Sequence, residues 1–249
     1  MQTRLSDAAY LDALERSTGR LAVLARKLDT ALPVASCPGW TVRDLLEHLG
    51  GVHAWSRSVI AGGNPKDPKP PLEGDPAEWY AAQATAMLTA MRAVDPRQPC
   101  WTFRKDEPTA GFWLRRQTHE TEMHLLDLAL AGTCDVEGHL PAHAADAISE
   151  SFDVMLPRMN RDRPVAVSAP ILLSATDTGC SWLIRPSDVP ATVDYTLMDS
   201  AETPDVEVRA AAPAHALLTG LWRRTPYQQW QISGERAVLD RLMASSLTP

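Results

Sequence analysis

Residues 112–132 read FWLRRQTHETEMHLLDLALAG, and their apolar side chains recur at spacings of three and four residues. This spacing is typical of an amphipathic helix that packs against a core. Glu120 and His124 lie four residues apart, slightly more than one helical turn, so both project from one face. A carboxylate on a face turned toward the interior must be paired, protonated or bound to a metal ion, because an unpaired buried charge is very costly. The stretch therefore predicts one helix of a bundle and part of a polar site inside it.

A second amphipathic stretch, TVRDLLEHLGGVHAW at 41–55, carries His48. His48 follows Leu45 by three residues and precedes Val52 by four, so it points along the apolar stripe. If this helix packs beside residues 112–132, His48, Glu120 and His124 converge. Two imidazoles and one carboxylate leave a fourth coordination position open, as catalytic zinc sites do. The sequence thus predicts a divalent metal site between the two helices.

Other residues near these motifs offer alternatives. His119 and Glu122 form a rival pair three residues apart on another face of the same helix, which looks like a solvated or interhelix edge. His53 is about 140° around its helix from His48 and is not expected as a co-ligand. Asp127 follows His124 by three residues and is either an ordinary carboxylate or the partner of its second ring nitrogen.

Apolar spacing and capping residues predict five helices in the first 160 residues, at about 6–28, 41–59, 75–94, 109–132 and 141–159. Three of them begin at residues that cap helices well, namely Ser6, Thr41 (with Asp44 three residues later) and Asp75 (with Pro76 next). Gly132 is expected to end the fourth helix.

After residue 160 the sequence changes to short β-rich segments, at about 165–167, 171–176, 182–184, 192–197 and 206–209. A helix from Pro213, a strand at 230–233 and a last helix from Glu235 follow. The predicted fold is a four-helix bundle with an extra helix over residues 1–160. A smaller α+β domain over residues 161–249 follows it.

Composition excludes several function classes. The 31 acidic and 24 basic residues give a net charge of −7, which disfavours nucleic acids and anionic membranes as partners. No stretch approaches the roughly 18 apolar residues that span a bilayer. The N-terminus shows no secretory signal, so we expect a cytoplasmic protein. Only four of the basic residues are lysine, which suggests a GC-rich genome.

Four scattered cysteines, Cys37, Cys100, Cys134 and Cys180, form no C-x-x-C motif. This argues against a zinc ribbon, a thioredoxin-like site or structural disulfides. None has the spacing or neighbouring base of an in-chain nucleophile, and Cys37 is interpreted as a packing residue of its loop.

Residues 37–49, CPGWTVRDLLEHL, and 116–127, RQTHETEMHLLD, resemble the mycothiol-dependent maleylpyruvate isomerase family of the DinB-like superfamily. Residues 174–179, SATDTG, with Trp182, and residues 217–224, LLTGLWRR, are also similar to the family. The resemblance extends over nearly the whole chain.

The resemblance implies a zinc-binding bundle with His48, Glu120 and His124 as ligands, and a C-terminal domain similar to sterol-carrier folds. It also implies the use of mycothiol, the low-molecular-weight thiol of actinobacteria. The family pattern Leu-Trp-Gly-Arg corresponds to residues 221–224, with Arg224 as the matching arginine and Arg223 in place of the glycine. Family members differ in function, so the resemblance does not identify the substrate.

The leading hypothesis is a zinc- and mycothiol-dependent enzyme, either an S-transferase or a cis–trans isomerase, whose substrate is a small, carboxylated electrophile. In this hypothesis the guanidinium of Arg224 binds the substrate carboxylate through two parallel hydrogen bonds. The alternative for Arg224 is a surface arginine favoured by a helix C-terminus. The alternatives for the protein are a non-catalytic metal-dependent binding or regulatory protein, and a hydrolase that uses zinc-bound water. The sequence leaves the oligomeric state open.

Overall fold

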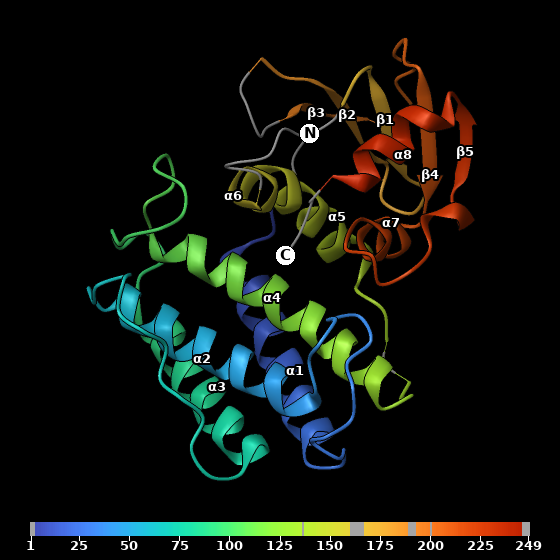
Figure 1. Cartoon of the computed structure of the whole chain (residues 1–249). Helices are drawn as coiled ribbons and strands as arrows, with labels where there is room; N and C mark the ends of the chain where they lie inside the picture. Colours follow the sequence, from blue (N-terminus) through green and yellow to red (C-terminus); the bar gives the residue numbers. More distant parts are fainter. Residues whose placement is uncertain (1–2, 136, 160–166, 189–192, 200, 246–249) are drawn as a thin grey trace. The chain divides into compact units, whose positions relative to one another are not determined.

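The computed structural model of the chain describes residues 3–135, 137–159, 167–188, 193–199 and 201–245. The chain divides into two compact units, Ser6–Gly138 and His139–Pro249, the latter together with Met1–Leu5. Figure 1 shows helices α1–α4 in the first unit and a sheet with helices in the second. The predicted fold class, a helical bundle followed by an α+β part, is confirmed. No helix within the described ranges is long and apolar enough to cross a membrane.

The first unit consists of α1 (Asp7–Ala25), α2 (Val42–Ile60), α3 (Pro76–Ala93) and α4 (Ala110–Ala131). Helix α1 packs on α4 and α3, and α2 packs on α3 and α4. The predicted caps form as hydrogen bonds. Ser6 accepts from the backbone N–H of Ala9, Thr41 and Asp44 make a reciprocal capping box, and Asp75 accepts from two N–H groups of α3.

Helix α4 ends at Ala131, with Gly132 next, as predicted, but for another physical reason. Gly132 has an ordinary φ of −84°, and the left-handed residue is Thr133 at +49°. A Cβ at position 132 would lie 2.6 Å from a methyl carbon of Leu28. Glycine at this position therefore makes room for the side chain of Leu28 and is not needed for a left-handed backbone turn.

The core of the bundle lies between α1, α2, α3 and α4. It is built from fully buried side chains that include Leu21, Leu45, Leu49, Tyr80 and Leu128. On α2, Leu45, Leu49 and Val59 are buried as the predicted stripe requires, whereas Val52 is half-buried. The stripe that contains His48 therefore faces α4 and the core, which fixes where the imidazole lies.

The second unit contains a five-stranded sheet in the order β3-β2-β1-β4-β5. Its strands are β1 (Ile171–Ala175), β2 (Cys180–Pro186), β3 (Val193–Asp199), β4 (Val208–Ala212) and β5 (Gln231–Gly234). Only the β1–β4 pair is parallel, with Leu173 opposite Ala210; the other pairs are antiparallel. The strand predicted at 165–167 lies largely outside the described residues.

Helices α7 (Ala214–Leu221) and α8 (Arg236–Ala244) pack on the strands of this sheet. A further helix enters the unit as α5 (Pro141–Glu150), passes through a π-helical turn at Ser151–Met155 and ends as α6 (Leu156–Met159). Because α5 packs on α7, the division falls at residue 139, whereas the sequence placed it near 160. The apolar pattern of α5 predicts a buried face but does not say which partner covers it.

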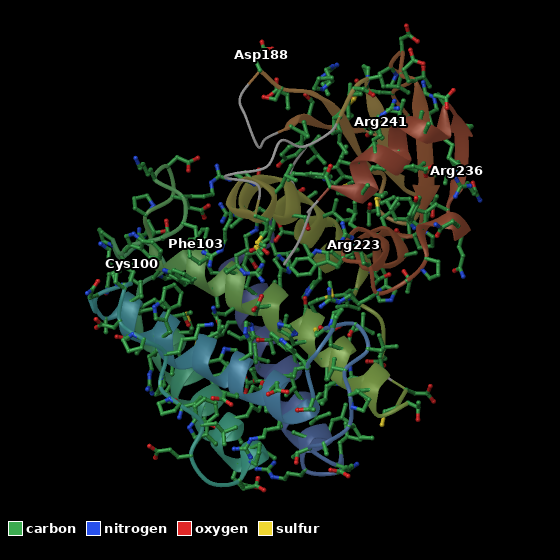
Figure 2. The ribbon with its side chains drawn as sticks, viewed as in Figure 1. Cys100, Phe103, Asp188, Arg223, Arg236 and Arg241 are labelled. Carbon is green, nitrogen blue, oxygen red and sulfur yellow. The ribbon has the colours of Figure 1, made fainter. Side chains whose placement is uncertain are left out.

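Arg223, which stands where the related pattern has glycine, has a φ of +60°. This left-handed conformation costs an ordinary residue roughly 1–2 kcal/mol and explains a preference for glycine there. The guanidinium of Arg223 compensates by donating to the carbonyl oxygens of Met243 and Ser245, 3.2 and 2.7 Å away at the end of α8. Figure 2 labels this side chain among those of the second unit. The substitution therefore keeps the turn that precedes Arg224.

Candidate metal centre

Three side chains from α2 and α4 meet inside the bundle as the sequence predicted. Nε2 of His48 lies 3.1 Å from Oε1 of Glu120, and Nε2 of His124 lies 3.5 Å from the same oxygen. The ligand atoms of all three residues lie within 4.8 Å of one another. Bond lengths of about 2.0–2.2 Å to zinc place tetrahedral nitrogen and oxygen ligands roughly 3.3 Å apart. The donor set therefore fits a divalent ion in both chemistry and spacing.

The carboxylate of Glu120 is held by charges on both sides. Oε2 pairs with the guanidinium of Arg116, one turn earlier on α4, and Oε1 faces the two histidines. Burial alone would raise the pKa of Glu120. The charge of Arg116 and the hydrogen bonds with His124 and His48 outweigh burial, so its pKa lies well below the usual value. Glu120 is thus ionised and oriented as a metal ligand must be.

The ring of His124 is fixed from its other side. Nδ1 lies 3.0 Å from Oδ2 of Asp127, a fully buried residue. Burial lowers the pKa of His124, but hydrogen bonds with Asp127, Cys37 and Glu120 raise it well above its ordinary value. An Nδ1–H bonded to a carboxylate leaves Nε2 directed at Glu120, which is the usual arrangement around a metal-ligating histidine. Of the two alternatives for Asp127, the geometry matches the partner of His124.

Two residues of the loop before α2, Cys37 and Trp40, contact this site, although the sequence pattern did not predict a role for them there. The Trp40 ring centroid lies 4.8 Å from that of His48 and 6.2 Å from that of His124, nearly parallel to the latter. Sγ of Cys37 lies 3.5 Å from Oδ2 of Asp127. Cys37 therefore has acid–base neighbours, contrary to its interpretation as a packing residue alone. The only early signal was that both residues belong to the segment CPGWTVRDLLEHL.

The rival pair lies elsewhere on α4. Nδ1 of His119 is 3.7 Å from Oε2 of Glu122, and the His119 ring meets Tyr10 edge-on at 5.9 Å. Within the described residues this pair joins no third potential metal ligand at the spacing of the first set. Its face is buried and not solvated, because Arg115 and His119 are 3% and 4% exposed. The pair is therefore part of the packing of α4.

His53 forms a separate buried contact on α2. It is fully buried, and its Nδ1 lies 2.8 Å from Oε1 of Gln117. Burial lowers the pKa of His53 to about 4, although the bond to Gln117 opposes this shift. As the sequence indicated, His53 does not join the donor set. It is a neutral residue in the core of the bundle.

We expect the free energy of unfolding to depend on pH because of His53. Its pKa of about 4 lies below the ordinary value of 6.5, so the unfolded chain binds its proton first as the pH falls. The contribution of neutral, buried His53 to the free energy of unfolding is fully present above pH 6.5. It falls by about 3 kcal/mol as the pH is lowered from 6.5 to 4. Urea unfolding of wild type and His53→Gln across this range should show a smaller loss in the variant. Equal losses would show that His53 is protonated in the folded state.

Arg224 lies in the second unit, after α7. Its Nη1 donates to the carbonyl oxygen of Trp222 at 2.8 Å, and its guanidinium carbon lies 5.6 Å from the Trp222 ring centroid. The side chain is half-buried, with its backbone N–H bonded to Thr219. The arginine is thus held on an aromatic ring at the end of a helix, an arrangement that suits a carboxylate-binding residue and also a structural one.

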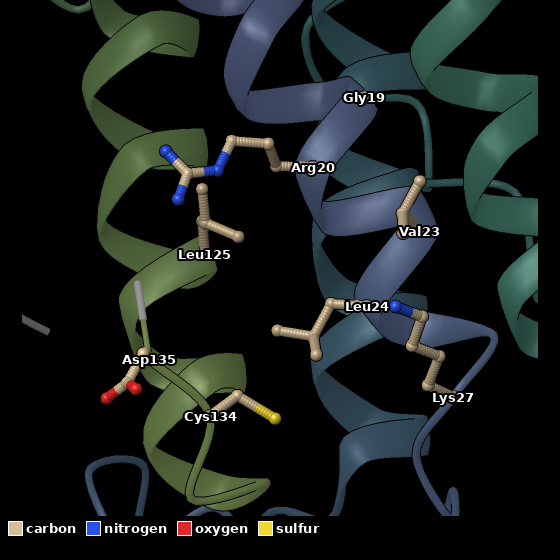
Figure 3. Close-up of a pocket in the computed structure, with 8 residues that line it drawn as sticks. All are labelled: Gly19, Arg20, Val23, Leu24, Lys27, Leu125, Cys134 and Asp135. Carbon is tan, nitrogen blue, oxygen red and sulfur yellow. The ribbon is translucent and has the colours of Figure 1, made fainter. Parts of the chain in front are cut away.

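A cavity of about 310 Å³ lies in the first unit, away from these donors. Figure 3 shows Arg20 and Leu24 of α1, with Lys27 of the turn that follows, on one side of it and Leu125 and Cys134 on the other. None of the three proposed ligands lines this cavity. This cavity is therefore separate from the site formed by His48, Glu120 and His124.

Comparisons with known proteins identify relatives of the chain. Residues 10–129 match the family model of the mycothiol maleylpyruvate isomerase N-terminal domain. A crystal structure of the mycothiol-dependent maleylpyruvate isomerase has a TM-score of 0.56 at 14% identity, over 93% of this chain and 95% of that one. A structure of a histidine-to-alanine mutant of the mycothiol-dependent maleylpyruvate isomerase gives 0.57 at 12% identity with the same coverage. No curated protein sequence matches the chain. At these identities the two structures establish a shared fold.

Proposed function

Because residues 10–129 belong to the family of mycothiol maleylpyruvate isomerase N-terminal domains, we propose that the chain is a mycothiol-dependent, zinc-dependent cis–trans isomerase. Its substrate would be a small unsaturated acid whose double bond is conjugated with a carbonyl group. The observation that carries the proposal is the convergence of His48, Glu120 and His124 on one point between α2 and α4. In the part of the chain that the structure describes, no fourth protein donor joins this set, which leaves a position for an external ligand.

A divalent ion on these donors would supply an open coordination position, at which the pKa of a bound thiol falls and its thiolate form prevails. Mycothiol bound there would supply a thiolate able to add reversibly to a double bond whose electron pair passes onto the conjugated carbonyl. Rotation about the resulting single bond and loss of the same thiolate would give the trans isomer with no net consumption of thiol. If departure fails, the same addition yields an S-transfer product.

The residues around the donors have distinct parts in this scheme. Arg116 keeps the carboxylate of Glu120 ionised and in place, and Asp127 fixes the ring of His124 through Nδ1. Trp40 packs against both histidine rings and restricts their movement. The match of residues 10–129 to the mycothiol maleylpyruvate isomerase domain supports a thiol, in place of water, as the reacting ligand.

Arg224 is proposed to bind the carboxylate of the substrate. Arg224→Leu should keep the fold and the metal content while turnover of carboxylated substrates falls roughly 10- to 100-fold, the value of one charge-assisted hydrogen-bond pair. Metal content, circular dichroism and kcat/KM are the measurements. Arg236→Leu, which removes an exposed arginine of the same unit, is the matched control and should leave kcat/KM unchanged. Unchanged turnover in both variants would assign Arg224 a structural role.

The product identifies the reaction. Metal-loaded protein is incubated with mycothiol and a panel of cis-unsaturated acids, activated alkenes and epoxides, and the mixture is followed by proton NMR. The proposal predicts a trans product with no net consumption of thiol. Accumulation of a thioether would favour the S-transferase. Release of a hydrolysed product without thiol would favour the hydrolase. Metal-dependent ligand binding with no product would indicate a binding or regulatory protein.

A further inference from the structure

The ring of His124 has potential ligand atoms near both of its nitrogens, and in the proposed reaction the Nδ1 side serves only to orient the ring. Nδ1 of His124 lies 3.0 Å from Oδ2 of Asp127, and Sγ of Cys37 lies 3.5 Å from the same oxygen. The ligand atoms of these three residues fall within 4.8 Å of one another, as do those of His48, Glu120 and His124. Two three-residue donor sets therefore share a single imidazole ring.

The spacing of the second set matches a tetrahedral metal site. With bonds of about 2.0 Å to nitrogen and oxygen and about 2.3 Å to sulfur, adjacent ligands are separated by roughly 3.3 Å (nitrogen to oxygen) and roughly 3.5 Å (sulfur to oxygen). The observed separations of 3.0 and 3.5 Å need only small adjustments. The set combines a thiol, an imidazole and a carboxylate, all of which bind zinc-like ions.

The thiol is presented by a rigid loop. The backbone N–H of Cys37 donates to the carbonyl of Val34 at 2.9 Å, and the N–H of Trp40 donates to the carbonyl of Cys37 at 3.0 Å. Gly39, with a φ of +85°, makes the turn between them. The other two residues of the set lie on α4, where Asp127 is fully buried and His124 is 7% exposed. Because both sides are fixed, a metal ion at this place would find its ligands already assembled.

We propose that Cys37, His124 and Asp127 form a second metal site, an alternative to the first, which takes soft divalent ions. A neutral imidazole has one unprotonated nitrogen, so His124 serves one set at a time. A metal ion at Nδ1 requires the ring proton on Nε2, where it faces Glu120. Thiolate favours soft ions, so cadmium should prefer this set, whereas zinc has acceptable donors in both. Soft ions at this site withdraw His124 from the first site.

The test uses cobalt and cadmium as spectroscopic probes, without added thiol. His48→Ala disables the first set and leaves the second complete. We expect it to bind about one cobalt per chain with a thiolate-to-cobalt charge-transfer band in the near ultraviolet. Adding Cys37→Ser should remove the band and weaken cobalt binding at least 100-fold. The matched control combines His48→Ala with Cys100→Ser instead of Cys37→Ser. It should leave both the band and the cobalt affinity unchanged. Cobalt bound without the band, or no cobalt bound to folded His48→Ala, would overturn the proposal.

Cadmium titration of the wild-type protein keeps the test decisive if His48→Ala fails to fold. We expect a thiolate-to-cadmium band that is absent in Cys37→Ser and retained in Cys134→Ser. Saturating cadmium without this band in folded wild-type protein contradicts the second site. Neither absorption band depends on turnover. The experiments can therefore refute the isomerase activity while supporting the second metal site, or support the activity while refuting the site.

Discussion

His124→Ala should leave the protein folded but without its metal ion and without thiol-dependent turnover. The substitution removes one of three donors and also the ring that Asp127 orients. The loss of metal affinity should exceed the roughly 10- to 100-fold that removal of an outer hydrogen-bond partner costs. Elemental analysis after gel filtration gives the metal content, and calorimetric titration with zinc gives the affinity.

The control for this substitution is His119→Ala. It removes a buried histidine from the same helix, five residues away and outside the donor set. It should bind zinc as the wild type does, whatever it costs in stability. Equal metal content in wild type and His124→Ala would exclude His124 from the site, and loss of zinc in His119→Ala alone would favour the rival pair.

Arg116→Met should destabilise the metal-free protein by about 3–5 kcal/mol, because it removes the buried guanidinium that pairs with Oε2 of Glu120. Arg116 is 4% exposed, so the interaction is little screened by solvent. A metal ion at the site supplies positive charge to the same carboxylate. Zinc should therefore restore more stability in Arg116→Met than it adds to the wild type. Urea unfolding with and without saturating zinc measures both effects.

The comparison for this variant is Arg26→Met, which breaks an exposed pair with Glu78 on the same bundle. Water screens exposed ion pairs, so the loss of stability should be small and independent of zinc. Similar decreases in the free energy of unfolding for the two variants would mean that solvent or the histidines stabilise the charge of Glu120. Arg116 would then not be needed to hold Glu120 as an ionised ligand.

The predicted features that the structure confirms depend on local chemistry. Capping residues act within three or four positions of the backbone groups they satisfy, so Ser6, Thr41 and Asp75 mark the starts of α1, α2 and α3 correctly. The convergence of His48 with Glu120 and His124 was predictable because an apolar stripe specifies the face of each helix that points inward. The identity of the bound ion and the role of Arg224 stay predictions.

The features missed by the sequence analysis arise from contacts between distant residues. Cys37 and Asp127 are 90 positions apart, so no spacing rule connects them. The position of Trp40 over two histidines depends on how its loop folds back onto α2. The pair of Arg116 with Glu120 is different, because the two residues lie one turn apart on α4 and their four-residue spacing was visible in the sequence. The placement of α5 with the sheet likewise depends on its partner and not on its own pattern.

The measurement that tests the account most directly is the thiol dependence of turnover at fixed metal content. Zinc-loaded protein is given a cis-unsaturated keto acid with and without mycothiol, and formation of the trans isomer is followed by NMR. The account predicts no conversion above background without thiol, and catalytic conversion with it that disappears when zinc is removed by a chelator and returns when zinc is restored. Conversion by the zinc-loaded protein alone, or thiol-dependent conversion that survives removal of zinc, would contradict it.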